Sequence, residues 1–191
     1  MRLRLGLAGL MIVLLAGCNA QTPPTASQAT AIPTQSIREA TMSGQSESLP
    51  KSVTATIKTN RGTIVVKLYL ESAPQTVTNF INKARSGFYQ GLTFHRVEDW
   101  VIQGGDPDGN GTGGGDMPTE LSEVPFKLGS LGVARAGDIK VSNDSQFFVC
   151  IKDCAWLTGQ YTNFGEVVSG LDTAKATQIG DKIESITISE D

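Results

Sequence analysis

Residues 53–68 read VTATIKTNRGTIVVKL, and their alternating pattern is the first indication of a β fold. Apolar side chains occupy every second position on both sides of a central turn: Val53, Ala55, Ile57, Ile64, Val66 and Leu68. This alternation has the period of a strand, in which successive side chains point to opposite faces. Gly62 lies at the turn and can adopt the positive φ that a tight hairpin needs. The stretch therefore predicts two antiparallel strands joined by a short turn.

A helix is expected directly after this hairpin. Ser72 is a good N-cap, and Pro74 stands in the first turn, where its missing N–H costs little. The apolar residues that follow are spaced i, i+3, i+4 and i+7, as on one helix face: Val77, Phe80, Ile81 and Ala84. Gly87 can end the helix. The pattern predicts one amphipathic helix between Ser72 and Gly87.

Beyond this helix the chain returns to short apolar runs that glycines separate. These runs are residues 100–103, 131–134, 146–151, 164–168 and 183–188. A second short helix is expected near residues 171–177. Many short strands with few helices indicate a closed barrel or a sandwich. A closed sheet would also leave no exposed strand edges.

The composition restricts the class of partner. The chain has 191 residues, a formal net charge of −3 and 39% hydrophobic residues, which suits one globular domain with extensions. From Lys51 to the C-terminus it carries 13 basic and 17 acidic residues. Nucleic-acid binding needs concentrated Lys and Arg, so this balance argues against a nucleic-acid partner.

Residues 1–17 have the features of a signal peptide. Arg2 and Arg4 form a basic start, and the apolar run of residues 5–16 is too short to span a bilayer comfortably. The run ends in Leu15-Ala16-Gly17-Cys18, which resembles the lipobox of bacterial lipoproteins, where the cysteine is lipidated and the chain is cut just before it. The alternative is an ordinary secretory signal with an incidental cysteine. We expect lipidation at Cys18 and an extracytoplasmic, membrane-anchored lipoprotein.

Residues 18–50 differ in composition from the segments on either side. Gln, Thr, Ser, Ala and Pro dominate, and large aliphatic side chains are few: Ile32, Ile37 and Leu49. Such a segment cannot bury enough apolar surface to offset its chain entropy. We therefore expect a lipidated Cys18, a flexible tether to residue 50, and one folded domain at residues 51–191.

Two glycine-rich patterns resemble ligand sites but match them poorly. Residues 109–114 match G-x-G-x-x-G, yet no helix is expected after them and the nearby aspartates would repel a phosphate, which favours a flexible surface loop. Residues 106–111 resemble the first half of a Ca²⁺ loop, but Met117 stands where that pattern has a bidentate Glu. We expect no metal site.

The remaining reactive side chains are few. His95 is the only histidine, and it is expected to be a hydrogen-bonded structural residue rather than a catalyst. Cys150 and Cys154 are spaced i, i+4. They either form a disulfide in an oxidising compartment or lie as a buried strand residue and a turn residue, and the spacing leaves both open. Composition and periodicity thus indicate a secreted, mostly β domain without indicating a reaction.

Six blocks of sequence occur in the order typical of the cyclophilin family. They are residues 73–80 (APQTVTNF), 94–97 (FHRV), 102–107 (IQGGDP), 145–148 (SQFF), 156–157 (WL) and 161–165 (YTNFG). The chain resembles this family from about Val53 to its end. The resemblance implies a closed eight-stranded antiparallel β-barrel capped by two short helices. It also implies peptidyl-prolyl cis-trans isomerase activity, which breaks no bond and needs no cofactor or metal.

The resemblance also implies roles for particular residues. Arg96 would be the main catalytic residue and Gln103 its partner. The proline pocket would be lined by Trp100, Val101, Phe148 and Leu157. The peptide groove would be flanked by Ala134, Arg135, Ala136 and Gln146, with Trp156 and Tyr161 at its rim.

Several positions depart from the family pattern. The segment between Arg96 and Trp100 is about one residue shorter than is common and lacks the usual proline. Trp100 is larger than the usual Phe, and Tyr161 replaces a frequent His. Arg135 stands where Asn is common, at a position that acts largely through its backbone.

We expect a monomeric isomerase that acts on proline-containing segments of secreted or envelope proteins and contacts the lipid bilayer through its anchor. The alternative is a binding module that holds such segments as a chaperone or adaptor with little turnover. Arg96 and Gln103 favour the enzyme, and the shortened segment before Trp100 leaves the alternative open.

Overall fold

The structure is a computed structural model, and it describes residues 52–191. The expected signal peptide, the lipidation site at Cys18 and the tether lie outside the described residues. Within residues 52–191, no helix is long and apolar enough to cross a membrane.

The expected hairpin is confirmed as the first structural unit. Strands β1 (Val53–Thr59) and β2 (Gly62–Leu68) pair from Val53 opposite Leu68 to Thr59 opposite Gly62. Gly62 has a φ of 141°, so the glycine serves the turn as expected. Strand β10 (Ile183–Glu190) pairs with the other edge of β1, which brings the C-terminus beside the start of the domain.

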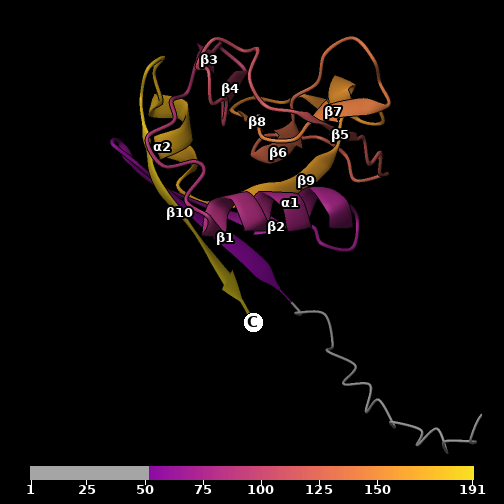
Figure 1. Ribbon diagram of the computed structural model, residues 1–191, viewed down its shortest axis with the longest axis horizontal. Helices are drawn as coiled ribbons and strands as arrows, with labels where there is room; N and C mark the ends of the chain where they lie inside the picture. Colours follow the sequence, from indigo (N-terminus) through magenta and orange to yellow (C-terminus); the bar gives the residue numbers. More distant parts are fainter. Residues whose placement is uncertain (1–51) are drawn as a thin grey trace, which may run out of the picture. The chain divides into compact units, whose positions relative to one another are not determined.

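The main sheet has eight antiparallel strands in the order β10-β1-β2-β9-β6-β8-β4-β3. The remaining members are β3 (Arg96–Val97), β4 (Val101–Gly104), β6 (Ser130–Val133), β8 (Phe147–Cys150) and β9 (Asn163–Ser169). A separate pair joins β5 (Asp116–Pro118) to β7 (Val141–Asn143). Figure 1 shows the long β10-β1-β2 part and the shorter strands of the sheet. The expected mostly β, eight-stranded antiparallel fold is confirmed.

The sheet does not close through its own edge strands. Strand β3 has only two residues, and β3 and β10 stand at opposite ends of the hydrogen-bonded order. The segment before β3 bonds instead to the start of β10 and to the residues just before it: Gly91 N–H donates to the Ile183 carbonyl at 2.8 Å, and Phe94 N–H donates to the Asp181 carbonyl at 2.9 Å. The sheet is thus a curled half-barrel that is open between β3 and β10 rather than closed strand to strand as expected, and these backbone bonds form a seam between its two ends.

In the described part of the chain, two α-helices and one 3₁₀ turn accompany the sheet. They are α1 (Pro74–Arg85), α2 (Leu171–Ala176) and η1 (Ala155–Leu157). Helix α1 packs on β10 and α2 packs on β2, and Figure 1 shows them against different parts of the sheet. The expected apolar face of α1 is buried, which confirms that pattern.

The prediction that Ser72 caps α1 is wrong. The N-cap is Ala73 rather than Ser72, and no side chain of the flanking residues caps it. The carboxylate of Glu120 does so from a distant loop, because it accepts the N–H groups of Gln75 at 3.0 Å and Thr76 at 2.7 Å. Pro74 does occupy the first turn, as expected.

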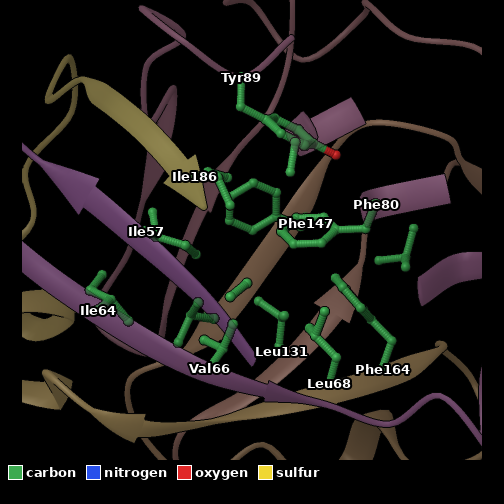
Figure 2. Packing of buried hydrophobic residues seen from close by; sticks show 14 of the residues in the cluster. Ile57, Ile64, Val66, Leu68, Phe80, Tyr89, Leu131, Phe147, Phe164 and Ile186 are labelled. Carbon is green, nitrogen blue, oxygen red and sulfur yellow. The ribbon is translucent and has the colours of Figure 1, made fainter. Parts of the chain in front are cut away.

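Buried apolar residues form two clusters. The larger lies between the sheet and α1, where Phe80 contacts the rings of Tyr89, Phe147 and Phe164 at 5.3–5.7 Å between centroids. Figure 2 shows these rings beside the aliphatic side chains of the sheet. The smaller cluster comprises Val101, Phe126, Phe148, Cys150, Cys154 and Leu157, with Trp100 and Tyr161 packed against it.

A disulfide lies inside the smaller cluster. Cys150 at the end of β8 is bonded to Cys154, and their Cα atoms are 6.4 Å apart. The bond ties β8 to the turn that leads into η1. The structure therefore decides between the two arrangements that the spacing alone left open.

Candidate active site

A pocket of about 360 Å³ opens above the smaller cluster. Its lining residues are Arg96, Trp100, Gln103, Ala134, Arg135, Phe148, Trp156, Leu157, Gln160 and Tyr161. Gln160 is the one that the sequence did not suggest. The other nine come from β3, β4 and the connection between them, from β8 and η1, and from the loops after β6 and η1, so the fold gathers residues that lie far apart in the chain.

Three of the expected site residues do not line this pocket. Val101 is fully buried beneath it, within the smaller cluster. Gln146 is also buried, behind Gln103. Ala136 lines a neighbouring hollow of about 290 Å³ together with residues of β5 and β7.

Arg96 and Gln103 face each other across the β3–β4 pair. They are directly opposite in the ladder, and Arg96 Nη1 donates to Gln103 Oε1 at 3.1 Å. Gln103 Nε2 then donates to Gln146 Oε1 at 2.9 Å, and Gln146 Nε2 donates to the carbonyl of Gly113 at 2.8 Å. A continuous row of hydrogen bonds therefore orients the guanidinium from the glycine-rich loop.

Asp106 shapes that loop, and the sequence did not suggest this role. Its buried carboxylate accepts backbone N–H groups of residues 108, 110, 111 and 113. Burial acts to raise the pKa of Asp106, but the N–H groups of Gly111, Asp108 and Asn110 outweigh it and hold the pKa below its ordinary value. The available signal was an Asp followed by Asn and Gly, residues that favour turns bonded to their own backbone. The segment expected to be a flexible surface loop is thus pinned by a buried anion.

The apolar floor of the pocket is centred on Phe148. Its ring stacks on Phe126 at 5.8 Å and meets the edge of Tyr161 at 5.8 Å. Gly132 on the adjacent strand β6 leaves room for it, because a Cβ at that position would overlap the Phe148 ring. The ring is therefore held in place from three sides.

Aromatic rings and a second guanidinium form the rim of the pocket. Trp100 and Trp156 meet edge to face at 5.3 Å, and Trp156 is 56% exposed. The Arg135 guanidinium lies 4.4 Å from the centre of the Tyr161 ring and donates to the Gln160 carbonyl at 3.0 Å. Arg135 thus contributes its side chain to the rim, in addition to the backbone role expected of it.

His95 lies outside this pocket. Burial lowers its pKa, Asp106 acts to raise it, and Arg96 acts to lower it further. The expectation of a hydrogen-bonded histidine is not met, because neither ring nitrogen has a partner among residues 52–191. The lining residues of the pocket include no serine, cysteine or histidine. The arrangement suits the binding of a small apolar ring beneath an oriented guanidinium rather than nucleophilic attack.

Comparison with known proteins points in the same direction. Residues 54–190 match the model of the family described as cyclophilin type peptidyl-prolyl cis-trans isomerase/CLD. The chain is 44% identical over 150 residues to a peptidyl-prolyl cis-trans isomerase of Helicobacter pylori, a match that covers 75% of this chain and 91% of that one. It is 43% identical over 130 residues to peptidyl-prolyl cis-trans isomerase B of Bacillus subtilis, covering 65% and 90% of the two chains.

A solved structure agrees with these matches. The cyclophilin type peptidyl-prolyl cis-trans isomerase of Cryptosporidium parvum superposes with a TM-score of 0.67 at 29% identity, covering 73% of this chain and 99% of that one. The likeness therefore extends over nearly the whole of that chain and about three quarters of this one.

Proposed function

Because this chain belongs to the cyclophilin-type family of peptidyl-prolyl cis-trans isomerases, we propose that it isomerises X–Pro bonds in the pocket beside Arg96. We also propose that its clients are secreted or envelope proteins. Arg96 is the catalytic residue of this proposal and Gln103 its partner. The observation that carries it is the guanidinium oriented by Gln103 at the edge of a pocket with an apolar floor.

The reaction needs rotation about a bond with partial double-bond character. The barrier is about 18–20 kcal/mol, and uncatalysed X–Pro exchange takes tens to hundreds of seconds. Catalysis requires that the enzyme bind the twisted amide more tightly than either planar form. A hydrogen bond to the carbonyl of the proline residue itself can favour a pyramidal prolyl nitrogen, which weakens the resonance of the rotating bond. Arg96 has N–H groups free to donate this bond after binding Gln103 and Glu98.

The apolar floor supplies the complementary function. Phe148 and Leu157 can hold the proline ring while the preceding carbonyl rotates, because both side chains are apolar and both line the pocket. Gln103 can bind substrate backbone only with the hydrogen-bonding capacity left after its contacts to Arg96 and Gln146.

The test measures two quantities on one X–Pro peptide, the isomerisation rate and the affinity, for the wild-type chain and for Arg96→Ala. Loss of rate with little loss of affinity supports the proposed site. A wild-type chain that binds the peptide without accelerating its isomerisation would support the binding-module alternative.

The proposed clients follow from the expected compartment. The lipobox-like segment at Cys18 and the disulfide between Cys150 and Cys154 both fit an extracytoplasmic location, where disulfides persist. A tether anchored at Cys18 would keep the pocket close to the membrane, where newly exported chains emerge.

A further inference from the structure

The Arg96 guanidinium also binds the carboxylate of Glu98, a residue that has no part in the proposed function as described so far. Arg96 Nε donates to Glu98 Oε1 at 2.8 Å, while Nη1 is bound to Gln103. The other oxygen of Glu98 accepts the indole N–H of Trp100 at 3.0 Å. The Trp100 ring in turn lies 5.5 Å from the guanidinium carbon. One carboxylate therefore joins the cation of the pocket to an aromatic residue of its rim.

The shortened connection between β3 and β4 produces this arrangement. Asp99 and Trp100 form a bend between Glu98 and Val101, and this bend places the Trp100 indole within hydrogen-bonding distance of the Glu98 carboxylate. The backbone of the connection is fixed at both ends, because Glu98 N–H donates to the Val101 carbonyl and Ile151 N–H donates to the Trp100 carbonyl, each at 2.8 Å. The geometry of the three side chains thus rests on an ordered backbone.

Burial and charge indicate what the contact does. The Arg96 and Glu98 side chains are 40% and 46% exposed, and ion pairs as exposed as this add little to stability. The carboxylate is nevertheless set up to accept two hydrogen bonds. Its pKa is lowered by the hydrogen bond from Arg96, so it is ionised at neutral pH. The neighbouring acid, Asp99, points elsewhere and pairs with Lys152 at 3.0 Å.

We propose that Glu98 is a positioning residue for the isomerisation, which fixes the plane of the Arg96 guanidinium and the position of the Trp100 ring. With Nε and one N–H of Nη1 occupied, the other N–H groups of Arg96 remain available to the pocket that this residue lines. A long side chain fixed in this way has less rotamer freedom to lose when the twisted amide forms, so the benefit falls on the transition state. The inference rests on the catalytic role proposed for Arg96.

The decisive variant is Glu98→Gln. A carboxamide has one acceptor oxygen, so it can accept from Arg96 or from Trp100 but presents an NH₂ group to the other. We expect kcat/KM to fall about tenfold, mainly through kcat, because the missing interaction belongs to the transition state. Asp99→Asn is the matched control, since it removes a carboxylate one position away without touching the pocket.

A second variant separates positioning from general disturbance. Trp100→Phe keeps an aromatic ring but removes the indole N–H, which in the Glu98→Gln variant competes with Arg96 for the single acceptor oxygen of the carboxamide. The kcat/KM of the double variant Glu98→Gln/Trp100→Phe should therefore lie within about threefold of that of Trp100→Phe alone. This loss is smaller than the losses of the two single variants combined. Thermal unfolding of every variant checks that the fold is retained.

The outcomes distinguish this inference from the proposed function. If Arg96→Ala is slow but Glu98→Gln is as fast as Asp99→Asn, Glu98 has no positioning role. The same conclusion follows if Glu98→Gln raises KM alone, or if removal of the indole N–H gives no recovery. If Arg96→Ala itself keeps the full rate, the proposed active site fails and the Glu98 inference fails with it.

Discussion

At the scale of single residues, the pocket depends on polar contacts that hold one cation in a defined orientation. Arg96 is reached from two directions, through Gln103 from β4 and through Glu98 from the connection before it. Gln146 and the carbonyl of Gly113 extend the first path to the loop organised by Asp106. The guanidinium therefore reaches the pocket already oriented, which reduces the reorganisation left to the reaction.

Arg96→Ala should lower the catalytic efficiency by about 10²–10³-fold, or roughly 3–4 kcal/mol of transition-state stabilisation. Peptide affinity and thermal stability should change far less, because the side chain faces an open pocket. Arg96→Lys should also be slow, since an ammonium cannot reproduce the planar fork that binds Glu98 and Gln103 together. Isomerisation kinetics of the three chains check this, and a Lys variant with the wild-type rate would contradict it.

At the scale of elements, the structure shows helix α1 completed by a residue remote from it. Ser72 does not cap α1. The first free N–H groups of the helix donate instead to the carboxylate of Glu120, which lies in the segment after β5. An anion at this end also complements the helix dipole. The contact ties the helix that covers the larger core to the loop segment that follows β5.

Glu120→Ala should therefore lower the free energy of unfolding by about 1–2 kcal/mol, the usual cost of losing a cap. Ser72→Ala is the matched control and should change it by less than about 0.5 kcal/mol. Urea denaturation of both variants measures the difference. Equal stabilities would show that the helix end is satisfied by water and that the carboxylate is dispensable.

At the scale of the whole molecule, the half-barrel is held together at its seam and at its hairpin. Asp181, in the segment before β10, accepts hydrogen bonds from the Arg61 and Asn60 side chains of the β1–β2 turn and from the N–H of Gln178. Burial acts to raise the pKa of Asp181, but these donors outweigh it and lower the pKa to about 2. The turn of the first hairpin is thereby fixed to the last strand of the chain.

This linkage predicts a pH dependence of stability. The folded pKa of Asp181 lies below that of an unfolded chain, about 3.9, so its contribution is complete above pH 4 and is lost as the pH falls toward 2. The Asp181→Asn variant should be less stable at pH 7, and the difference from wild type should shrink between pH 4 and pH 2. Denaturation at several pH values measures it, with the exposed Asp153→Asn as control. A constant difference over this range would contradict the linkage.

The proposed anchor is also a property of the whole molecule, although Cys18 lies outside the described residues. Cys18→Ser should move the protein from the membrane to the soluble fraction of its native host, since stable anchoring of a tethered domain needs covalently attached acyl chains. Fractionation followed by detection of the folded domain measures this. Equal solubility of the two proteins would remove the lipoprotein proposal and leave the isomerase unaffected.

Local pattern was sufficient for much of the fold. The β1–β2 hairpin and the buried face of α1 follow from spacing within a few residues, because strand and helix periods place neighbouring side chains on one face. The resemblance to the family likewise indicated twelve site residues, and nine of them, including Arg96, line one pocket.

Contacts between residues far apart in the chain became visible only in the tertiary structure. The cap of α1 by Glu120 and the Gln103–Gln146 bond join positions separated by more than 40 residues, and no local pattern encodes either. The seam of the sheet depends in the same way on which backbone groups meet when the chain curls. Glu98 lies close to Arg96 in sequence, yet its role depends on two strands that fix both ends of a short connection. Periodicity thus determined which faces are buried, whereas hydrogen-bond partners were decided by how the buried faces came together, since a polar side chain binds whichever donor or acceptor the fold places within about 3 Å of it.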